Sequence, residues 1–117
     1  MIVRIALVIL VLALSACSSS TPSSTAPTPG TSVSIVSGSS NLTTTAYAPN
    51  PVTVAVGGTV TWMNNDSVAH NSVSNSGVFN SGTIAPGGTY SYTFPTAGSY
   101  PYHCSIHPGM AGTVTVQ

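Results

Sequence analysis

One cysteine, one histidine and one methionine lie within seven residues near the C-terminus, in the order Cys104, His107 and Met110. A second histidine, His70, lies 34 positions before the cysteine. One thiolate and two imidazoles in a plane, with a weak thioether on the axis, are the ligands of a copper site that transfers single electrons. Thiolate and thioether suit Cu(I) and imidazole suits Cu(II), so these side chains predict one copper ion per chain that cycles between both valences.

Two residues separate each of these three C-terminal side chains, which gives the pattern Cys-x-x-His-x-x-Met. Pro108 and Gly109 fill the second gap, and both residue types favour tight turns. The pattern therefore predicts one short loop that directs three side chains toward the same ion. A further histidine, His103, directly precedes the cysteine. Neighbouring residues of a strand point to opposite faces, so we expect His103 to point away from the metal.

The chain is almost without charge, because Arg4 and Asp66 are its only charged residues among 117. An average chain has about a quarter of its residues charged. The basic surface of a nucleic-acid-binding protein is missing. Catalysis by paired carboxylates is excluded by the single acidic residue, and Schiff-base chemistry by the absence of lysine. The composition therefore predicts a protein that is not an enzyme and does not bind nucleic acid.

Residues 1–16 have the features of a signal peptide: Arg4, a ten-residue apolar run from Ile5 to Leu14, and small residues before Cys17. This segment resembles a bacterial lipoprotein signal, which implies cleavage before Cys17 and lipidation of that cysteine. We therefore expect an extracytoplasmic protein, periplasmic or at the cell surface, that is anchored to a membrane through Cys17. The alternatives are a plain secretory signal and a transmembrane helix, although a helix needs about 20 apolar residues to span a bilayer.

Residues 17–32 begin with the lipidated cysteine and continue as a tether of serine, threonine and proline. Such a segment has too little apolar surface to fold, so we expect a flexible linker of at most ~50 Å when fully extended. A disulfide between Cys17 and Cys104 is the alternative use of the two cysteines. We do not expect it, because lipid and metal account for each cysteine separately.

Residues 33–117 are predicted to form one all-β domain. Apolar side chains alternate with small or polar ones, as in half-buried strands. The alternating sets are Val33/Ile35, Val52/Val54/Val56, Val60/Trp62, Tyr90/Tyr92/Phe94, Tyr100/Tyr102/Cys104 and Val114/Val116. Glycine and proline interrupt these sets at the spacing that turns require. Short strands in a chain of this length favour a two-sheet Greek-key sandwich.

Residues 47–117 resemble the plastocyanin/amicyanin-type cupredoxins, the family of type 1 blue-copper proteins. The resemblance rests on the stretch from Tyr47 through Trp62-Met-Asn-Asn-Asp66, which precedes His70, and on the short Cys-x-x-His-x-x-Met loop. It implies a cupredoxin-like sandwich and a preformed copper site with His70, Cys104, His107 and Met110 as ligands. It also implies a hydrophobic surface around the second histidine and no catalytic turnover.

The resemblance also implies a supporting role for Asn71, which follows the first ligand. In the family an asparagine at this position connects the two ligand-bearing segments near the cysteine sulfur, where hydrogen bonds tune the reduction potential. The alternative is an ordinary turn asparagine. Trp62 is expected to pack in the core rather than to relay electrons.

The sequence thus predicts a monomeric, membrane-tethered carrier of single electrons between a donor and an acceptor protein. Without charged patches, long-range steering of a partner should be weak, so we expect docking on an uncharged surface near His107, Pro108 and Gly109. Two alternatives remain open: a copper storage or delivery protein with the same fold, and a metal-free β-sandwich that mediates interactions.

Overall fold

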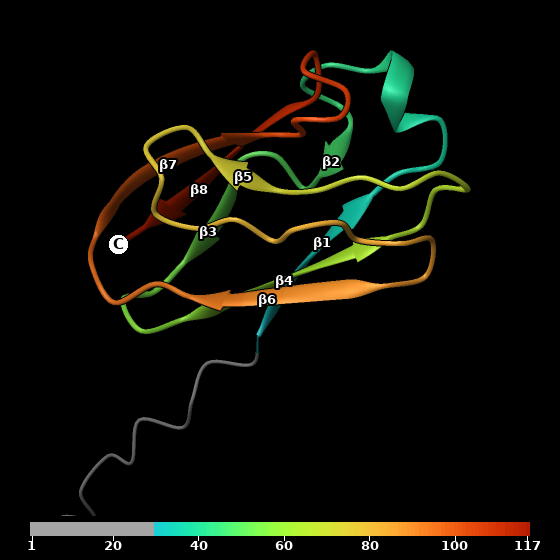
Figure 1. Cartoon of the computed structure of the whole chain (residues 1–117). Coiled ribbons are helices and arrows are strands. Elements are labelled where there is room, and N and C mark those ends of the chain that lie inside the picture. Colours follow the sequence, from blue (N-terminus) through green and yellow to red (C-terminus); the bar gives the residue numbers. More distant parts are fainter. Residues whose placement is uncertain (1–29) are drawn as a thin grey trace, which may run out of the picture.

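A computed structural model of the protein describes residues 30–117, and Figure 1 shows two β-sheets packed face to face. The elements are β1 (Thr31–Ile35), the 3-10 helix η1 (Ser39–Asn41), β2 (Tyr47–Ala48), β3 (Val52–Val54), β4 (Thr59–Asn64), β5 (Val73–Ser74), β6 (Thr89–Thr93), β7 (Gly98–His103) and β8 (Ala111–Val116). The predicted all-β, two-sheet fold is confirmed.

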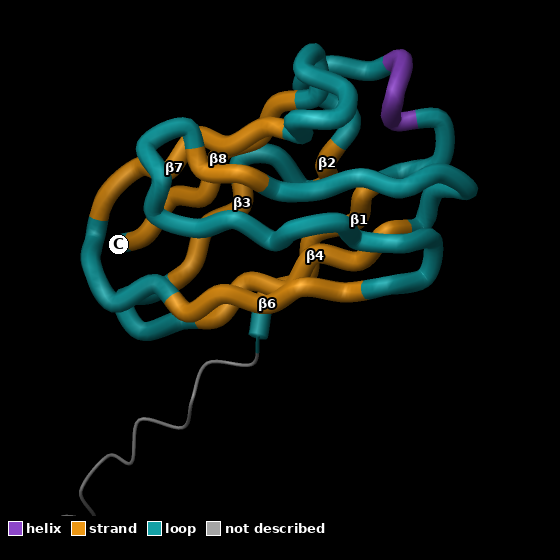
Figure 2. The backbone as a smooth tube through the Cα atoms, viewed as in Figure 1, coloured by secondary structure: helices purple, strands orange, loops and turns teal. Residues whose placement is uncertain are grey.

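Each sheet has four strands and mixes parallel with antiparallel pairs. The first sheet has the order β2-β1-β4-β6, in which β1 and β4 are parallel. The second has the order β3-β8-β7-β5, in which β3 and β8 are parallel. Long loops connect β4 to β5 and β5 to β6, as Figure 2 shows. The chain therefore crosses repeatedly between the sheets, and the loops gather at the two ends of the sandwich.

The alternating apolar residues identify six of the eight strands, but Val56 lies outside β3 and is 53% exposed. The reason is the turn at Gly57, whose φ of 81° ends the strand. The amide of Gly57 donates to the carbonyl of Phe94, at 2.7 Å. Strands β2 and β5 were not expected, because two residues are too few to show a period of two.

The core lies between the sheets and is rich in aromatic rings. Trp62 is fully buried, with ring centroids of Phe79, Tyr90 and Tyr102 at 5.2, 5.7 and 5.4 Å. This position confirms the expectation that Trp62 packs in the core. Tyr47 packs edge-on against Tyr102, with a centroid separation of 4.7 Å. Large, rigid rings supply much apolar burial in a small domain.

The first strand begins at Thr31, two residues before the domain boundary expected at 33. Thr31 and Ser32 pair with Val60 and Thr61 of β4 through the backbone, and such pairing needs no apolar side chain. The signal peptide predicted at 1–16, the lipidated Cys17 and the tether up to residue 29 lie outside the described residues. Among residues 30–117, no helix has the length and apolar character to cross a bilayer.

The loop between β7 and β8 lies at one end of the sandwich, and residue 30 lies at the other. Figure 1 shows the β7–β8 loop at the top, together with η1, while the chain enters β1 from below. The strand pairing agrees, because Thr31 pairs with Val60 near the start of β4, whereas His70 follows the end of β4. The two ends of the domain are therefore distinct, and β1 runs from one to the other.

Gly112 is expected to be essential for the packing of β7 on β8. A Cβ atom at this position would lie 2.5 Å from Cζ and Oη of the buried Tyr102 ring. That ring has no room to move, because Tyr47 and Trp62 pack edge-on against it. Gly112→Ala should therefore lower the free energy of unfolding by about 1–3 kcal/mol, as other overpacked cores do. Urea titration of the metal-free protein measures this change.

Gly109→Ala provides the matched control. A Cβ atom at Gly109 would have no neighbour within 4 Å, and its φ is not in the left-handed region. The control should therefore unfold at the urea concentration of the parent. Equal stability of Gly112→Ala and the parent would contradict the packing of Tyr102 on Gly112.

Candidate metal centre

The loop between β7 and β8, residues 104–110, contains three of the four side chains singled out in the sequence. The amide of Cys104 donates to the carbonyl of Met110 at 3.2 Å, and the amide of Met110 donates to the carbonyl of His107 at 3.0 Å. The second bond closes a four-residue turn with Pro108 and Gly109 at its centre. The tight turn expected from the spacing is therefore present, and it folds the loop back on itself.

His70 reaches the same place from the segment that connects β4 of the first sheet to β5 of the second sheet. It lies between β4 and β5, where its backbone exchanges two hydrogen bonds with Ile84, of 3.2 and 2.8 Å. The side-chain amide of Asn64, at the end of β4, donates to the carbonyl of Ile84 at 2.9 Å. These contacts fix the backbone of His70, so its imidazole is held in place before any metal arrives.

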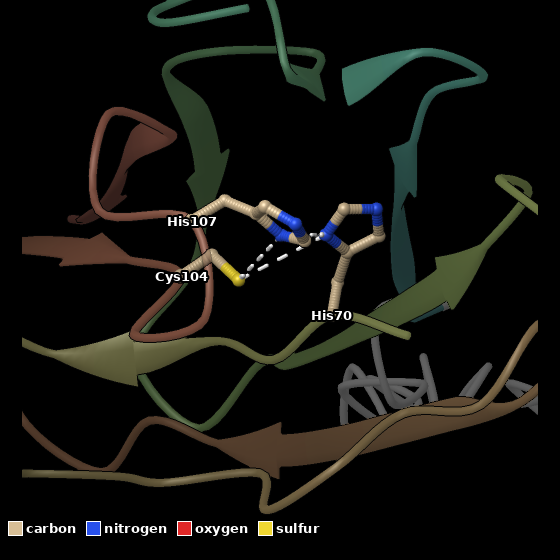
Figure 3. A group of neighbouring side chains, drawn as sticks. All are labelled: His70, Cys104 and His107. Atoms are coloured by element: carbon tan, nitrogen blue, oxygen red, sulfur yellow. Dashed lines mark hydrogen bonds between the residues drawn. The ribbon is translucent and has the colours of Figure 1, made fainter. Parts of the chain in front are cut away.

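Three potential metal-binding atoms converge between these segments, as Figure 3 shows. The Sγ atom of Cys104 lies 3.8 Å from Nδ1 of His70 and 3.9 Å from Nδ1 of His107. The two Nδ1 atoms are 3.1 Å apart. Cys104 and His70 are fully buried, whereas His107 is partly exposed. One ion could therefore contact all three atoms, and His107 would be the side chain between this ion and solvent.

Met110 is fully buried at the end of the same loop. Its backbone is hydrogen-bonded to both Cys104 and His107. One thiolate, two imidazoles and a thioether form a donor set that suits copper in both valences. The arrangement thus fits one copper ion, with a soft sulfur atom and two ring nitrogens already facing one another.

Asn71 connects the two segments that carry these side chains. Its Oδ1 accepts a hydrogen bond from the amide of Ser105 at 2.8 Å, and its Nδ2 donates to the hydroxyl of Ser105 at 2.7 Å. Ser105 directly follows Cys104 in the loop. The carbonyl of Asn71 also accepts from the hydroxyl of Tyr47 at 2.7 Å. The bridging contact implied by the resemblance is therefore present, and it restrains the position of the sulfur atom.

The single acidic residue of the chain also belongs to this site, which the sequence reasoning missed. Oδ2 of Asp66 lies 2.8 Å from Nε2 of His70. The buried hydroxyl of Ser39, in η1, lies 3.0 Å from the same nitrogen and donates to Oδ2 of Asp66 at 3.3 Å. The spacing of four residues between Asp66 and His70 was a usable signal, whereas nothing in the sequence pointed to Ser39.

Hydrogen bonds keep Asp66 ionised. The bond with His70, followed by those from the amides of Gly38 and Ser67, holds the pKa of the Asp66 carboxyl well below its usual range. Both amides donate to Oδ1, at 3.1 and 2.8 Å. The site therefore contains one fixed negative charge beside His70, in a part of the chain that has no other charged side chain.

His103 lies outside the site, as the alternation of the strand predicts. Its Nδ1 is hydrogen-bonded to Oδ1 of Asn75, at 2.6 Å, on the outer side of β7. Tyr102 and Cys104, on either side of it, are buried.

Burial raises the pKa of Tyr102 to about 12, so its ring stays neutral beside the site.

Comparison with known proteins identifies the family of this chain. The family model for copper-binding proteins of the plastocyanin/azurin type matches residues 33–117. Plastocyanin of Scenedesmus fuscus is 42% identical over 84 residues, covering 61% of this chain and 86% of that protein. Amicyanin of Paracoccus denitrificans is 41% identical over 78 residues, covering 61% of this chain and 58% of that protein.

Solved structures give a consistent picture of the fold. A purple cupredoxin from Nitrosopumilus maritimus superposes with a TM-score of 0.69 and 37% identity, covering 74% of this chain and 99% of that chain. A reduced, Cu(I) form of an amicyanin variant superposes with a TM-score of 0.64 and 31% identity, covering 80% of this chain and 87% of that chain. The similarity therefore extends over the whole sandwich and not only over the ligand loop.

Proposed function

The chain belongs to the plastocyanin/azurin family of copper-binding proteins, and on this basis we propose that it carries single electrons between extracytoplasmic redox proteins. The observation that carries the proposal is the convergence of Cys104 Sγ with the Nδ1 atoms of His70 and His107 in a rigid site. Its relatives are electron carriers and not enzymes, which agrees with the expectation from composition.

We assign the metal ligands to His70, Cys104, His107 and Met110. Copper, when bound, supplies a one-electron couple between Cu(II) and Cu(I). The protein holds the two histidine rings and the thiolate through the turn at 107–110, the bridge from Asn71 and the backbone bonds of His70. Because these contacts do not depend on the metal's valence, the site needs little rearrangement when an electron enters or leaves.

His107 is the proposed point of electron exchange with a partner. It is the only one of the four ligands that is partly exposed. Around it Ile106 is 47% exposed, and Pro108 and Gly109 are also exposed. This surface contains no charged residue, so a partner would dock through apolar and backbone contacts.

Voltammetry and copper exchange together test the assignment as an electron carrier. A carrier should give a reversible one-electron wave and release copper slowly to a chelator. A copper delivery protein should transfer its ion rapidly to an apo-protein, and a metal-free interaction module should bind no copper. Fast release without a reversible wave would favour delivery, and absence of binding would remove both copper functions.

The location is part of the same proposal. Residues 1–16 would act as the signal peptide, Cys17 would carry the lipid, and residues 18–30 would tether a monomeric domain to the outer side of a membrane. Tethering raises the effective concentration of the carrier near membrane-bound partners. This would compensate for the lack of charges that could attract a partner from a distance.

Electron self-exchange should depend little on salt. Carriers that are steered by charged patches slow down or speed up as salt screens interactions over a Debye length of ~10 Å. Here Asp66 is the only charged side chain of residues 30–117, and it is buried. The self-exchange rate, measured from NMR line broadening in mixtures of oxidised and reduced protein, should therefore stay nearly constant between low and high ionic strength.

Gly109→Asp tests where the two molecules meet. Gly109 is exposed beside His107, so two added carboxylates would face each other in the self-exchange contact. The variant should exchange electrons more slowly than the parent at low salt and recover as salt is added. A steep salt dependence in the parent, or an unchanged rate in Gly109→Asp, would rule out docking on this uncharged surface.

A further inference from the structure

We propose that Asp66 is a positioning residue for the copper site: its carboxylate fixes the tautomer and direction of the His70 ring and places one negative charge beside the metal. The proposal rests on the function proposed above, because it concerns how the chain prepares its copper ligand. It assigns a role to the only acidic side chain of the protein.

The hydrogen bonds define which nitrogen of His70 is protonated. A carboxylate only accepts hydrogen bonds, and Oδ2 of Asp66 lies 2.8 Å from Nε2 of His70, so this nitrogen must be the donor. The hydroxyl of Ser39 gives its own proton to the same Oδ2. A neutral imidazole with its proton on Nε2 has its lone pair on Nδ1. Nδ1 is the atom that faces Cys104 and His107.

The carboxylate is itself held rigidly. Oδ1 accepts from the amides of Gly38 and Ser67, and the amide of Asp66 donates to Oδ1 of Asn64 at 2.9 Å. Figure 3 shows Nδ1 of His70 directed toward the other two side chains and Nε2 on the far side of the ring. Asp66 thus contacts the His70 ring at Nε2, while Nδ1 on the opposite side of the ring faces Cys104 and His107. Carboxylates that accept a hydrogen bond from a metal-binding histidine commonly raise the affinity of the site for its metal.

The charge of Asp66 has a separate effect. A negative charge near the metal favours the more positive valence, Cu(II), over Cu(I). Residues 30–117 contain no other charged side chain to oppose or screen it, and Asp66 is only 8% exposed. Asp66 should therefore lower the reduction potential of this protein.

The test compares three variants of the copper-loaded full chain. Asp66→Asn keeps the shape, removes the charge and leaves one acceptor oxygen for the donors around it. It should bind Cu(II) about 10- to 100-fold more weakly than the parent and show a higher reduction potential. Asn65→Asp adds a charge at the exposed neighbouring position and should leave both values close to those of the parent.

The double variant Asn65→Asp/Asp66→Asn moves the charge by one residue without changing the net charge. It should behave like Asp66→Asn, because the contact with His70 is lost. Recovery of the parent potential in the double variant would show that only net charge matters. An unchanged affinity and potential in Asp66→Asn would overturn the proposal outright.

NMR of the Cu(I)-loaded parent tests the tautomer without any substitution, so the proposal stays testable even if Asp66→Asn does not fold. The Nε2 proton of His70 should exchange slowly with water, and the nitrogen shifts should identify Nδ1 as the metal-bound atom. A proton on Nδ1, or a rapidly exchanging Nε2 proton, would contradict the role of Asp66. If the parent binds no copper, the proposed function fails instead, and the two failures are thus distinguishable.

Discussion

Cys104→Ser is expected to abolish the intense colour of the copper-loaded protein. The colour of a blue-copper site arises from charge transfer between a thiolate and Cu(II), and residues 30–117 contain no other thiol. A serine hydroxyl is a hard, weakly acidic ligand and cannot replace the thiolate. The variant should lose the visible charge-transfer band completely and bind Cu(I) much more weakly. Absorption spectroscopy during copper titration measures both effects.

Met110→Leu is the matched control for that loss. Leucine fills a similar buried volume but has no sulfur atom, so only the weak axial ligand is removed. The control should keep its copper and its colour, and its reduction potential should rise because the axial thioether no longer stabilises Cu(II). A Cys104→Ser protein that retains the parent's colour would refute the assignment of the site.

Cys17→Ala is expected to convert a membrane-bound protein into a soluble one. If Cys17 carries the lipid, its removal leaves the mature chain without an acyl anchor. Several buried acyl chains hold a protein stably on a membrane, so the change in partitioning should be nearly complete. Fractionation of cells that express parent and variant measures the distribution.

Ser20→Ala is a suitable control in the same segment, because it leaves the cysteine and the signal intact. It should remain with the membrane like the parent. Identical partitioning of Cys17→Ala and the parent would rule out lipidation at Cys17. Recovery of both proteins in the soluble fraction would instead favour a plain secretory signal.

The grouping of the candidate ligands was predictable from sequence because three of them share one short loop. Local spacing determines which side chains of Cys104, His107 and Met110 can meet, and a turn with Pro108 and Gly109 is a local property. The alternation of apolar residues similarly predicted the long strands and excluded His103. Side-chain periodicity is visible wherever one face of a strand is buried.

The contact of Ser39 with His70 was not predictable, since it depends on long-range packing. Ser39 lies 31 residues before His70, in a short 3-10 helix with no sequence signature, and meets it only after β1 and β4 pair. The two-residue strands β2 and β5 also take their conformation from their neighbours in the sheets. Local sequence contains no information on such contacts, whereas the family resemblance indicated the bridge made by Asn71.

Strand β1 determines how the domain is oriented relative to residue 30. The chain enters the domain at residue 30, at the end of the sandwich opposite the ligand loop (Figure 1). On the proposed anchor, residues 18–30 would separate the bilayer from the domain by roughly 20 Å on average and 45 Å at full stretch. His107 would then point away from the lipid in the average orientation. A soluble acceptor could reach it directly, whereas a donor embedded in the bilayer could be reached only when the domain turns over on its tether. The time taken by that rotation would set an upper limit on how fast electrons pass from the membrane to the surrounding medium.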